Sequence, residues 1–132
     1  MIGCQILSQK EVDKMRILWL SRHVPQEAQV AALRERFGDI EIVRRAITLH
    51  NNPRAGADEV ERLLAEVGAI EMVGVLPIPH LAEVTQRGIH PIRAIMTRTP
   101  TGSVLPNGEI EYNFDFERFE RVIKIEVVTE KL

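Results

Sequence analysis

Three consecutive polar residues, Ser21, Arg22 and His23, carry side chains suited to chemistry on an anion. They follow Met15–Leu20, an almost unbroken apolar run, and precede Pro25, where a helical pattern begins. An imidazole titrates near neutral pH and can act as acid or base, and a guanidinium offers phosphate a planar fork of donors. A serine hydroxyl adds one more hydrogen-bonding group. The triplet is therefore our candidate for binding a phosphate and moving a proton.

The elements on either side of the triplet decide where it lies in the fold. The length of the apolar run is typical of a strand buried on both faces, as in a parallel sheet. A turn between such a strand and a helix lies at the carboxyl edge of the sheet, where open α/β folds bind ligands. The free N–H groups and dipole at the start of the helix also favour anions. The alternative is structural, because His23 could simply cap the helix or pack beneath its first turn.

The other three histidines offer further candidates. His50 and Asn51 belong to a turn after the second predicted strand, at the same edge, so that His50 could meet His23 across the sheet surface. The alternative for His50 is a solvated turn residue, the more common role of an isolated histidine. His80 falls in the first turn of a predicted helix, and for His90 we favour a structural role. Scattered histidines with no carboxylate cluster beside them predict no metal centre, and we expect neither metal nor cofactor.

Strand and helix patterns alternate three times along the first two thirds of the chain. Such alternation predicts parallel strands joined by right-handed crossovers, and therefore an open, three-layer α/β fold. The expected elements are a strand over Met15–Leu20, a helix over Pro25–Phe37, a strand over Ile40–Leu49, a helix from an Asp58–Glu61 capping box to Gly68, a strand over Ile70–Ile78, a helix over Pro79–Arg87 and a strand over Pro91–Thr99.

The C-terminal part of the chain changes character and indicates paired strands. The triplet Thr101–Ser103 is expected to break the fourth strand, and Pro106–Gly108 is a strong hairpin signal. Alternating apolar and polar residues over Ile110–Phe116 predict a strand with one wet face, and Arg121–Thr129 is a further β-rich run. We expect this C-terminal β-hairpin to extend one edge of the mostly parallel sheet or to form an interface.

Length and composition limit the class of protein. The 132 residues suit a single domain, which we expect over residues 15–132, with Met1–Lys14 as a leader or as an edge strand through Cys4–Leu7. Seventeen Lys and Arg against 19 Asp and Glu give a net charge of −2, which argues against binding long nucleic acid. One cysteine allows neither an internal disulfide nor a zinc motif. No apolar run approaches the ~20 residues that span a bilayer, and no signal peptide is recognisable, so we expect a cytoplasmic protein that is not membrane-bound.

Several enzyme classes lack their motifs in this chain. There is no G-x-G-x-x-G, no Walker loop, no H-E-x-x-H, no C-x-x-C and no G-x-S-x-G. Hydrolysis of nucleoside triphosphates, dinucleotide redox chemistry and a structural zinc are therefore unsupported. The charge balance still permits a small anionic ligand held by a few local cations.

Several short motifs, taken together in their order and spacing, point to a known family. They are Trp19–Pro25, Val73–Pro77, Leu81–Glu83, Arg87–Gly88 and, more loosely, Leu49–His50. With these motifs the chain resembles the small single-domain ring nucleases of type III CRISPR systems, over about residues 15–98. The C-terminal hairpin and the leader depart from the pattern of the shortest members.

The resemblance implies a Rossmann-like fold and a metal-independent phosphodiesterase that opens cyclic tetra-adenylate, the second messenger that activates CRISPR effectors. Attack of a ribose 2′-hydroxyl on the neighbouring phosphate needs in-line positioning, a cation for the developing charge and proton transfer to the leaving oxygen. A symmetric ring is most simply held on the axis of a C₂ homodimer. The residues implied are Ser21, Arg22 and His23 for catalysis, and His50, Asn51, Pro77 and His80 for ligand contacts.

Three functions remain open from the sequence. The first is the ring nuclease. The second is a binding module of the same fold that senses or sequesters a cyclic oligonucleotide without cleaving it. The third is an oligomerising protein without enzymatic activity, in which the hairpin mediates assembly and the polar turn is incidental.

Overall fold

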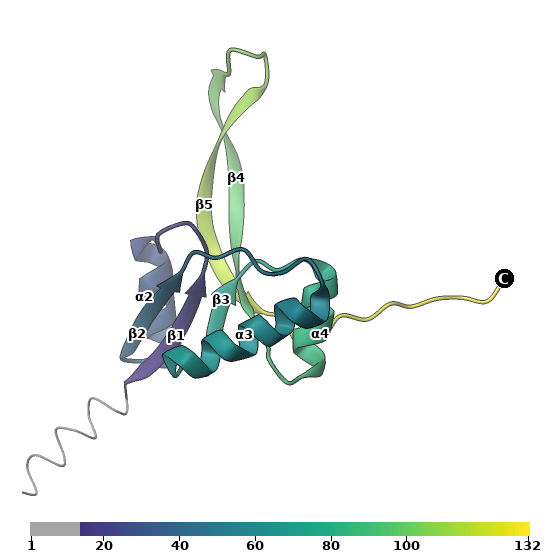
Figure 1. Ribbon diagram of the computed structural model, residues 1–132. Helices are drawn as coiled ribbons and strands as arrows, with labels where there is room; N and C mark the ends of the chain where they lie inside the picture. Colours follow the sequence, from purple (N-terminus) through teal and green to yellow (C-terminus); the bar gives the residue numbers. More distant parts are fainter. Residues whose placement is uncertain (1–13) are drawn as a thin grey trace, which may run out of the picture.

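The structure, a computed structural model, describes residues 14–132, and within them the chain forms one five-stranded mixed sheet with three helices (Figure 1). In the strand order β2-β1-β3-β4-β5, β1 to β4 are parallel and β5 is antiparallel to β4. The α/β class, the parallel first strands and the hairpin at the sheet edge are therefore confirmed, whereas residues 1–13 of the expected leader lie outside the described residues. The elements are β1 (Met15–Leu20), α2 (Glu27–Phe37), β2 (Ile40–Arg45), α3 (Pro53–Val67), β3 (Glu71–Gly74), α4 (Ile78–Gln86), β4 (Ile92–Val104) and β5 (Ile110–Arg121).

Helices cover both faces of the sheet (Figure 1). On one face α2 contributes Leu33 to a cluster with Ile17 of β1. On the other face α3 and α4 contribute Val60 and Val84 to a cluster with Leu18 of β1. Successive β1 side chains thus enter opposite clusters, as the period of two in a strand requires. The prediction that this strand is buried on both faces is confirmed. The helices in the described part of the chain are too short or too polar to cross a membrane.

The two central strands, β1 and β3, form the switch point of the sheet. From β1 the chain runs through α2 to β2 on one side, and it returns through α3 to β3 on the other side of β1. In open α/β sheets, such a point leaves a crevice at the carboxyl ends of the two strands. Close pairing there favours Gly74, because a Cβ on this residue would make a tight contact, 3.0 Å from the Leu20 carbonyl oxygen. The residues that directly follow the two strands, Ser21–His23 and Val75, therefore lie together at this crevice.

The β4–β5 hairpin extends well beyond the rest of the sheet (Figure 1). Most side chains over Met96–Phe116, here called the hairpin arm, are exposed. The tip closes as its sequence predicted: the Leu105 N–H donates to the Glu109 carbonyl oxygen at 2.7 Å, and Gly108 adopts a φ of 88°. A two-stranded hairpin is marginally stable by itself in water, so its base must be held by the sheet.

Two predicted strands end earlier than the sequence suggests. β2 was expected over Ile40–Leu49 but ends at Arg45, because its last ladder partner is Leu20, where β1 itself ends. β3 was expected over Ile70–Ile78 but ends at Gly74, which is also paired with Leu20. The lengths of the flanking strands are thus set by the central strand and not by their own apolar runs.

The predictions for the C-terminal strands need two corrections. The Thr101–Ser103 triplet does not break the fourth strand, because β4 continues to Val104 and a register shift before that residue accommodates Gly102 at a φ of 88°. The β-rich run Arg121–Thr129 forms no strand beyond its first residue. Its ladder partner explains this, since Arg121 already pairs with Ile92, the first residue of β4.

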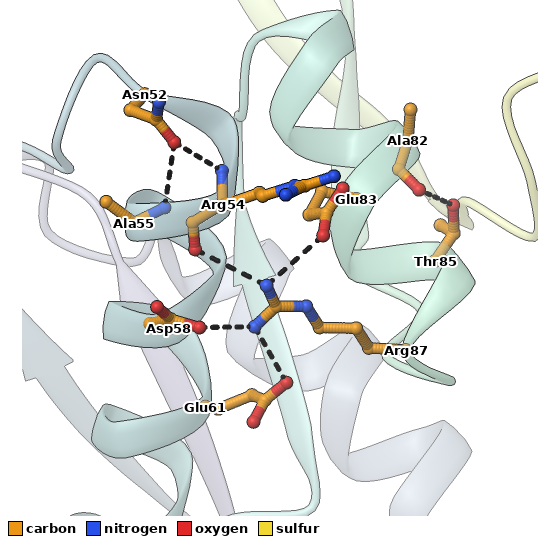
Figure 2. A network of polar contacts seen from close by, with 9 residues as sticks. All are labelled: Asn52, Arg54, Ala55, Asp58, Glu61, Ala82, Glu83, Thr85 and Arg87. Atoms are coloured by element: carbon orange, nitrogen blue, oxygen red, sulfur yellow. Dashed lines mark hydrogen bonds and ion pairs between the residues drawn. The ribbon is translucent and has the colours of Figure 1, made fainter.

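The capping box predicted at Asp58 and Glu61 is wrong. α3 begins at Pro53 and is capped by Asn52, whose Oδ1 accepts hydrogen bonds from the next two backbone N–H groups at 2.9 and 3.1 Å (Figure 2). Proline suits the first helical position because its φ is already fixed and its missing N–H is not needed there. α2 similarly begins at Glu27, two residues later than predicted, whereas α4 agrees with its prediction to within one residue at each end.

The two acidic residues of the supposed capping box instead bind Arg87, directly after α4. Its guanidinium is 2.7 Å from Asp58 Oδ1, 3.0 Å from Glu61 Oε1 and 3.2 Å from Glu83 Oε1 (Figure 2). The hydrogen bond to Asp58, and to a smaller extent the one to Glu61, raises the pKa of Arg87 above its usual range. Arg87 therefore joins α4 to α3.

Candidate functional site

The turn after β1 is held by contacts to its backbone. The indole Nε1 of the buried Trp19 donates a hydrogen bond to the His23 carbonyl oxygen at 2.9 Å. The His23 backbone N–H donates to Ser21 Oγ at 3.1 Å. These bonds fix the path of the chain and leave the Arg22 and His23 side chains exposed. Ser21 therefore shapes the turn, in addition to the catalytic role predicted for it.

This turn lines a cavity of about 740 Å³ at the carboxyl edge, here called the first hollow. The start of α2 and the end of β3 also line it, together with residues of β4 and β5. Its volume lies within the range of roughly 300–1,000 Å³ found for small-molecule sites. No carboxylate from the described part of the chain lines it. Its hydrogen-bonding side chains include those of Ser21, Arg22, His23, Gln26 and Gln29.

The charge of the first hollow favours an anion. Arg22 Nη2 donates to Thr48 Oγ1 at 3.2 Å, which directs the guanidinium toward the loop after β2. Among residues 14–132, Arg22 has no carboxylate partner and the His23 ring has no hydrogen-bond partner. The N-terminus of α2, at Glu27, begins directly after Gln26 and places the positive end of the helix dipole beside them. An incoming phosphate could thus bind to these donors without displacing an existing ion pair.

A second hollow, of about 640 Å³, adjoins the first at the same edge. Leu20, Ile47 and Val75 line both cavities. The loop after β2 and the starts of α3 and α4 form the rest of its lining. It brings together all four of the residues predicted as ligand contacts, namely His50, Asn51, Pro77 and His80.

His80 lines the second hollow, but its side chain is buried. It is 5% exposed, and its Nε2 lies 2.7 Å from the His50 carbonyl oxygen. A carbonyl can only accept, so Nε2 carries a proton. The same ring edge packs against α3, where a Cβ on Gly56 would lie 2.5 Å from His80 Cδ2. His80 Nδ1 is buried and has no partner among the described residues. The ring therefore ties α4 to α3 and to the loop after β2.

His50 also forms hydrogen bonds within the protein. Its backbone N–H donates to Glu59 Oε1 at 3.0 Å, and its Nδ1 accepts from the Asn52 N–H at 2.9 Å. In the neutral ring the proton is then on Nε2, which is the one ring nitrogen left for a ligand. His50 and His23 line different hollows, so the structure does not bring them together as the sequence suggested.

A third hollow, of about 360 Å³, lies between α2 and β5 and includes none of the predicted site residues. Among its charged lining residues, Arg118 is 2.6 Å from Glu117 and 2.7 Å from Glu120, and Arg121 is 2.6 Å from Glu71 of β3. The hydrogen bond from Arg118 holds the pKa of Glu120 below its ordinary value, and Glu120 in turn raises the pKa of Arg118. Because both carboxylates and two of the three arginines in the lining are already paired, we do not assign a ligand to this cavity.

Sequence reasoning missed three residues of the first hollow and its border. Gln29 is 6% exposed, and Thr48 holds the Arg22 guanidinium. Phe114 lines the cavity from the hairpin arm, where it is 62% exposed. Gln29 had a signal, because it precedes the buried Leu33 by four positions and so places an amide on the apolar face of α2. Nothing in the local sequence indicated that Phe114 would return to the turn after β1.

Comparisons of the chain with family models, curated proteins and solved structures found no match. Within residues 14–132, no three His, Cys, Asp or Glu side chains form a group that could hold a metal ion. The functional interpretation therefore rests on the residues and geometry of the two adjoining hollows.

Proposed function

We propose that this protein is a metal-independent phosphodiesterase that opens a cyclic oligoadenylate, with cyclic tetra-adenylate as its substrate. One observation carries the proposal: Arg22 and His23 are exposed in the first hollow, directly after the central strand β1 and beside the start of α2. The motifs that resemble CRISPR ring nucleases surround this turn. We also propose that the sheet is Rossmann-like, which the parallel order β2-β1-β3-β4 supports.

The reaction is a transesterification within the ring. A ribose 2′-oxygen forms a bond to the adjacent phosphorus and loses its proton to solvent, while the bond from phosphorus to the 5′-oxygen breaks. The Arg22 guanidinium stabilises the charge that develops on the phosphate, and the His23 imidazolium gives its proton to the departing 5′-oxygen. The products are a 2′,3′-cyclic phosphate and a 5′-hydroxyl on a linear chain. Substrate and product therefore have the same mass.

The second hollow provides room for the rest of the ring. It adjoins the first hollow along Leu20, Ile47 and Val75, so that an oligonucleotide can extend from one cavity to the other. Asn51 and Pro77 line it, and the Nε2 of His50 is available for a ligand contact. Asn51, Pro77 and His50 thus fit a binding role, whereas the His80 ring is already bound to the His50 carbonyl group. Catalysis is assigned to the first hollow.

We propose that the working form is a homodimer, in which each copy presents one turn to a two-fold symmetric ring. Exposed apolar side chains on the outer hairpin arm support this, since Val104 is 66% and Ile110 is 53% exposed. Light scattering is expected to give about twice the 15.0 kDa of one chain. A mass equal to one chain at micromolar concentration would contradict the dimer.

A binding module without catalysis is the second candidate, and one observation favours it. The His23 ring has no orienting hydrogen bond within residues 14–132, whereas catalytic histidines are commonly held by a carboxylate or carbonyl group. Catalysis then requires the substrate itself to position the ring. A sensor or sequestering protein needs only the positive charge of Arg22 and His23 to bind the phosphate.

Incubation of the purified protein with cyclic tetra-adenylate, in the presence of a chelator, separates these functions. The phosphodiesterase gives a linear product of unchanged mass that separates from the ring by chromatography. Retention of intact ring supports the binding module. A product heavier by one water would show hydrolysis and contradict the mechanism proposed here, and neither binding nor cleavage would contradict both functions.

A further inference from the structure

The first hollow has an apolar wall that takes no part in the proposed reaction at the phosphate. Phe114 and Met96 line it from β5 and β4, and these side chains are 62% and 36% exposed. An aromatic ring that is left in water at a ligand cavity is a surface on which a nucleobase can stack, and such stacking tolerates different bases. The same cavity thus combines a flat apolar wall with the cationic side chains of Arg22 and His23.

Gln29 adds a hydrogen-bond donor to this cavity. Its Oε1 accepts the Gln26 backbone N–H at 2.8 Å, and because that N–H can only donate, the accepting atom is the oxygen. The amide NH₂ group is therefore left over, and it has no acceptor among the described residues. The NH₂ nitrogen is not among the buried polar atoms without a partner, so this group reaches the cavity and can donate to a ligand there. Glutamine amides are frequent partners of purine ring edges.

We propose that the first hollow is a purine nucleotide site. The base stacks on Phe114 and Met96, a ring nitrogen accepts a hydrogen bond from the Gln29 amide, and the phosphate binds at Arg22 and His23. The inference rests on the proposed function for the nature of the ligand, but it assigns base recognition to α2 and the hairpin arm. The volume of about 740 Å³ accommodates one nucleotide.

The test uses mononucleotides and intact protein. Trp19 is the only tryptophan and lines the first hollow, so its fluorescence reports occupancy, with calorimetry as an independent measure of binding. We expect adenosine 5′-monophosphate to bind about 5- to 150-fold more tightly than ribose 5-phosphate, which is the effect of one stacked base. No binding of adenosine monophosphate at millimolar concentration, or equal affinity for both ligands, would overturn the inference.

Three variants locate the base. Phe114→Ala should remove most of the preference for adenosine monophosphate while leaving the affinity for ribose 5-phosphate unchanged. Gln29→Glu keeps an oxygen for the Gln26 N–H but removes the donor, and should also reduce the preference. Tyr112→Ala is the control, because Tyr112 lies under the Arg98 guanidinium on the hairpin arm and does not line the hollow. Thermal melts verify that each variant is folded.

The outcomes distinguish this inference from the proposed function. Binding of adenosine monophosphate that depends on Phe114, without cleavage of cyclic tetra-adenylate, would retain the nucleotide site and reject the phosphodiesterase. If cyclic tetra-adenylate is cleaved but the preference for adenosine monophosphate is unchanged in the Phe114 and Gln29 variants, the nucleotide site as assigned is rejected and the phosphodiesterase is retained. If Phe114→Ala instead changes the mass of the assembly and leaves nucleotide binding intact, this wall is an interface between copies, and the inference is overturned.

Discussion

The two hollows at the carboxyl edge contain similar side chains but use them differently. In the second hollow, His80 Nε2 binds the His50 carbonyl group, and His50 Nδ1 binds the N–H at the start of α3. In the first hollow, Arg22 has one hydrogen bond to a threonine hydroxyl, and the His23 ring has none within residues 14–132. The histidines of the second hollow thus hold the fold together and leave only the Nε2 of His50 for a ligand, whereas the His23 ring has no such hydrogen bond to lose in the described part of the chain.

The two hollows should therefore respond differently to mutation: in one, substitutions should reduce activity, and in the other, they should reduce stability. Changes at Arg22 and His23 should reduce binding or cleavage and leave the free energy of unfolding nearly unchanged, since exposed side chains away from packing usually contribute about 0.5 kcal/mol or less. Changes around His80 should lower stability first. Measuring both quantities for each variant therefore tests whether the two hollows differ as the structure indicates.

The largest effect is expected at His23. If its ring protonates the departing oxygen, His23→Ala should lower the single-turnover rate of cyclic tetra-adenylate cleavage by about 10²- to 10⁴-fold, with binding less affected. Equal losses in binding and rate would show that the ring only positions the phosphate. His90→Ala is the control, because His90 lines neither hollow, and we expect its rate to match the wild type. A wild-type rate for His23→Ala would remove the distinction between the hollows.

A smaller effect, on stability, is expected at Gly56. In an open helix, glycine to alanine stabilises by about 0.5–1 kcal/mol, but here the new Cβ would lie 2.5 Å from His80 Cδ2. Gly56→Ala should therefore destabilise the protein by about 1–3 kcal/mol, measured by urea unfolding. The double variant Gly56→Ala/His80→Ala lacks the contact between the new Cβ and the imidazole. It should therefore be more stable than His80→Ala alone. A stabilising Gly56→Ala would contradict the packing described for the second hollow.

The smallest effect concerns an ion pair that lines neither of these hollows. The hydrogen bond from Arg118 lowers the pKa of Glu120 from its ordinary value of 4.5. A lowered carboxyl pKa contributes stability that is present above the ordinary value and is lost as pH falls through the folded-state value. The melting temperature should therefore fall less steeply for Glu120→Gln than for the wild type as the pH falls below 4.5, the ordinary pKa of this carboxyl. Glu66→Gln, an exposed change, is the control, and identical slopes for Glu120→Gln and wild type would contradict the assignment.

The sequence predicted much of the fold because local patterns coincide with long-range pairing in its central part. The apolar run Met15–Leu20 defined β1 correctly, and the Pro106–Gly108 signal identified the hairpin tip. The ends of β2 and β3 could not be predicted, since they depend on where Leu20 leaves the ladder. The β-rich segment after Arg121 failed for the same reason, because β4 has no residue left with which to pair.

The candidate site was predicted in part. The position of Ser21–His23 followed from one strand and one helix, so that local sequence was sufficient. Separation of His23 from His50 depends on how the loop after β2 packs against α3, which no residue pattern encodes. The contribution of Phe114 requires a strand distant in sequence to lie beside the turn. Contacts of this kind are set by the sheet order and become visible only in three dimensions.

The central claim is that the turn after β1 binds the reacting phosphate, and Arg22→Ala tests it most directly. Loss of a charge-assisted contact that strengthens in the transition state costs about 3 kcal/mol, or roughly a hundredfold in rate. Single-turnover cleavage of cyclic tetra-adenylate and thermal melts should be measured for this variant and for Arg62→Ala, which removes the same charge from an exposed position of α3 outside both hollows. We predict a hundredfold slower, weaker-binding but fully stable Arg22→Ala, beside an unchanged Arg62→Ala. Equal rates for the two variants, or a loss in Arg22→Ala that follows from unfolding, would contradict the account.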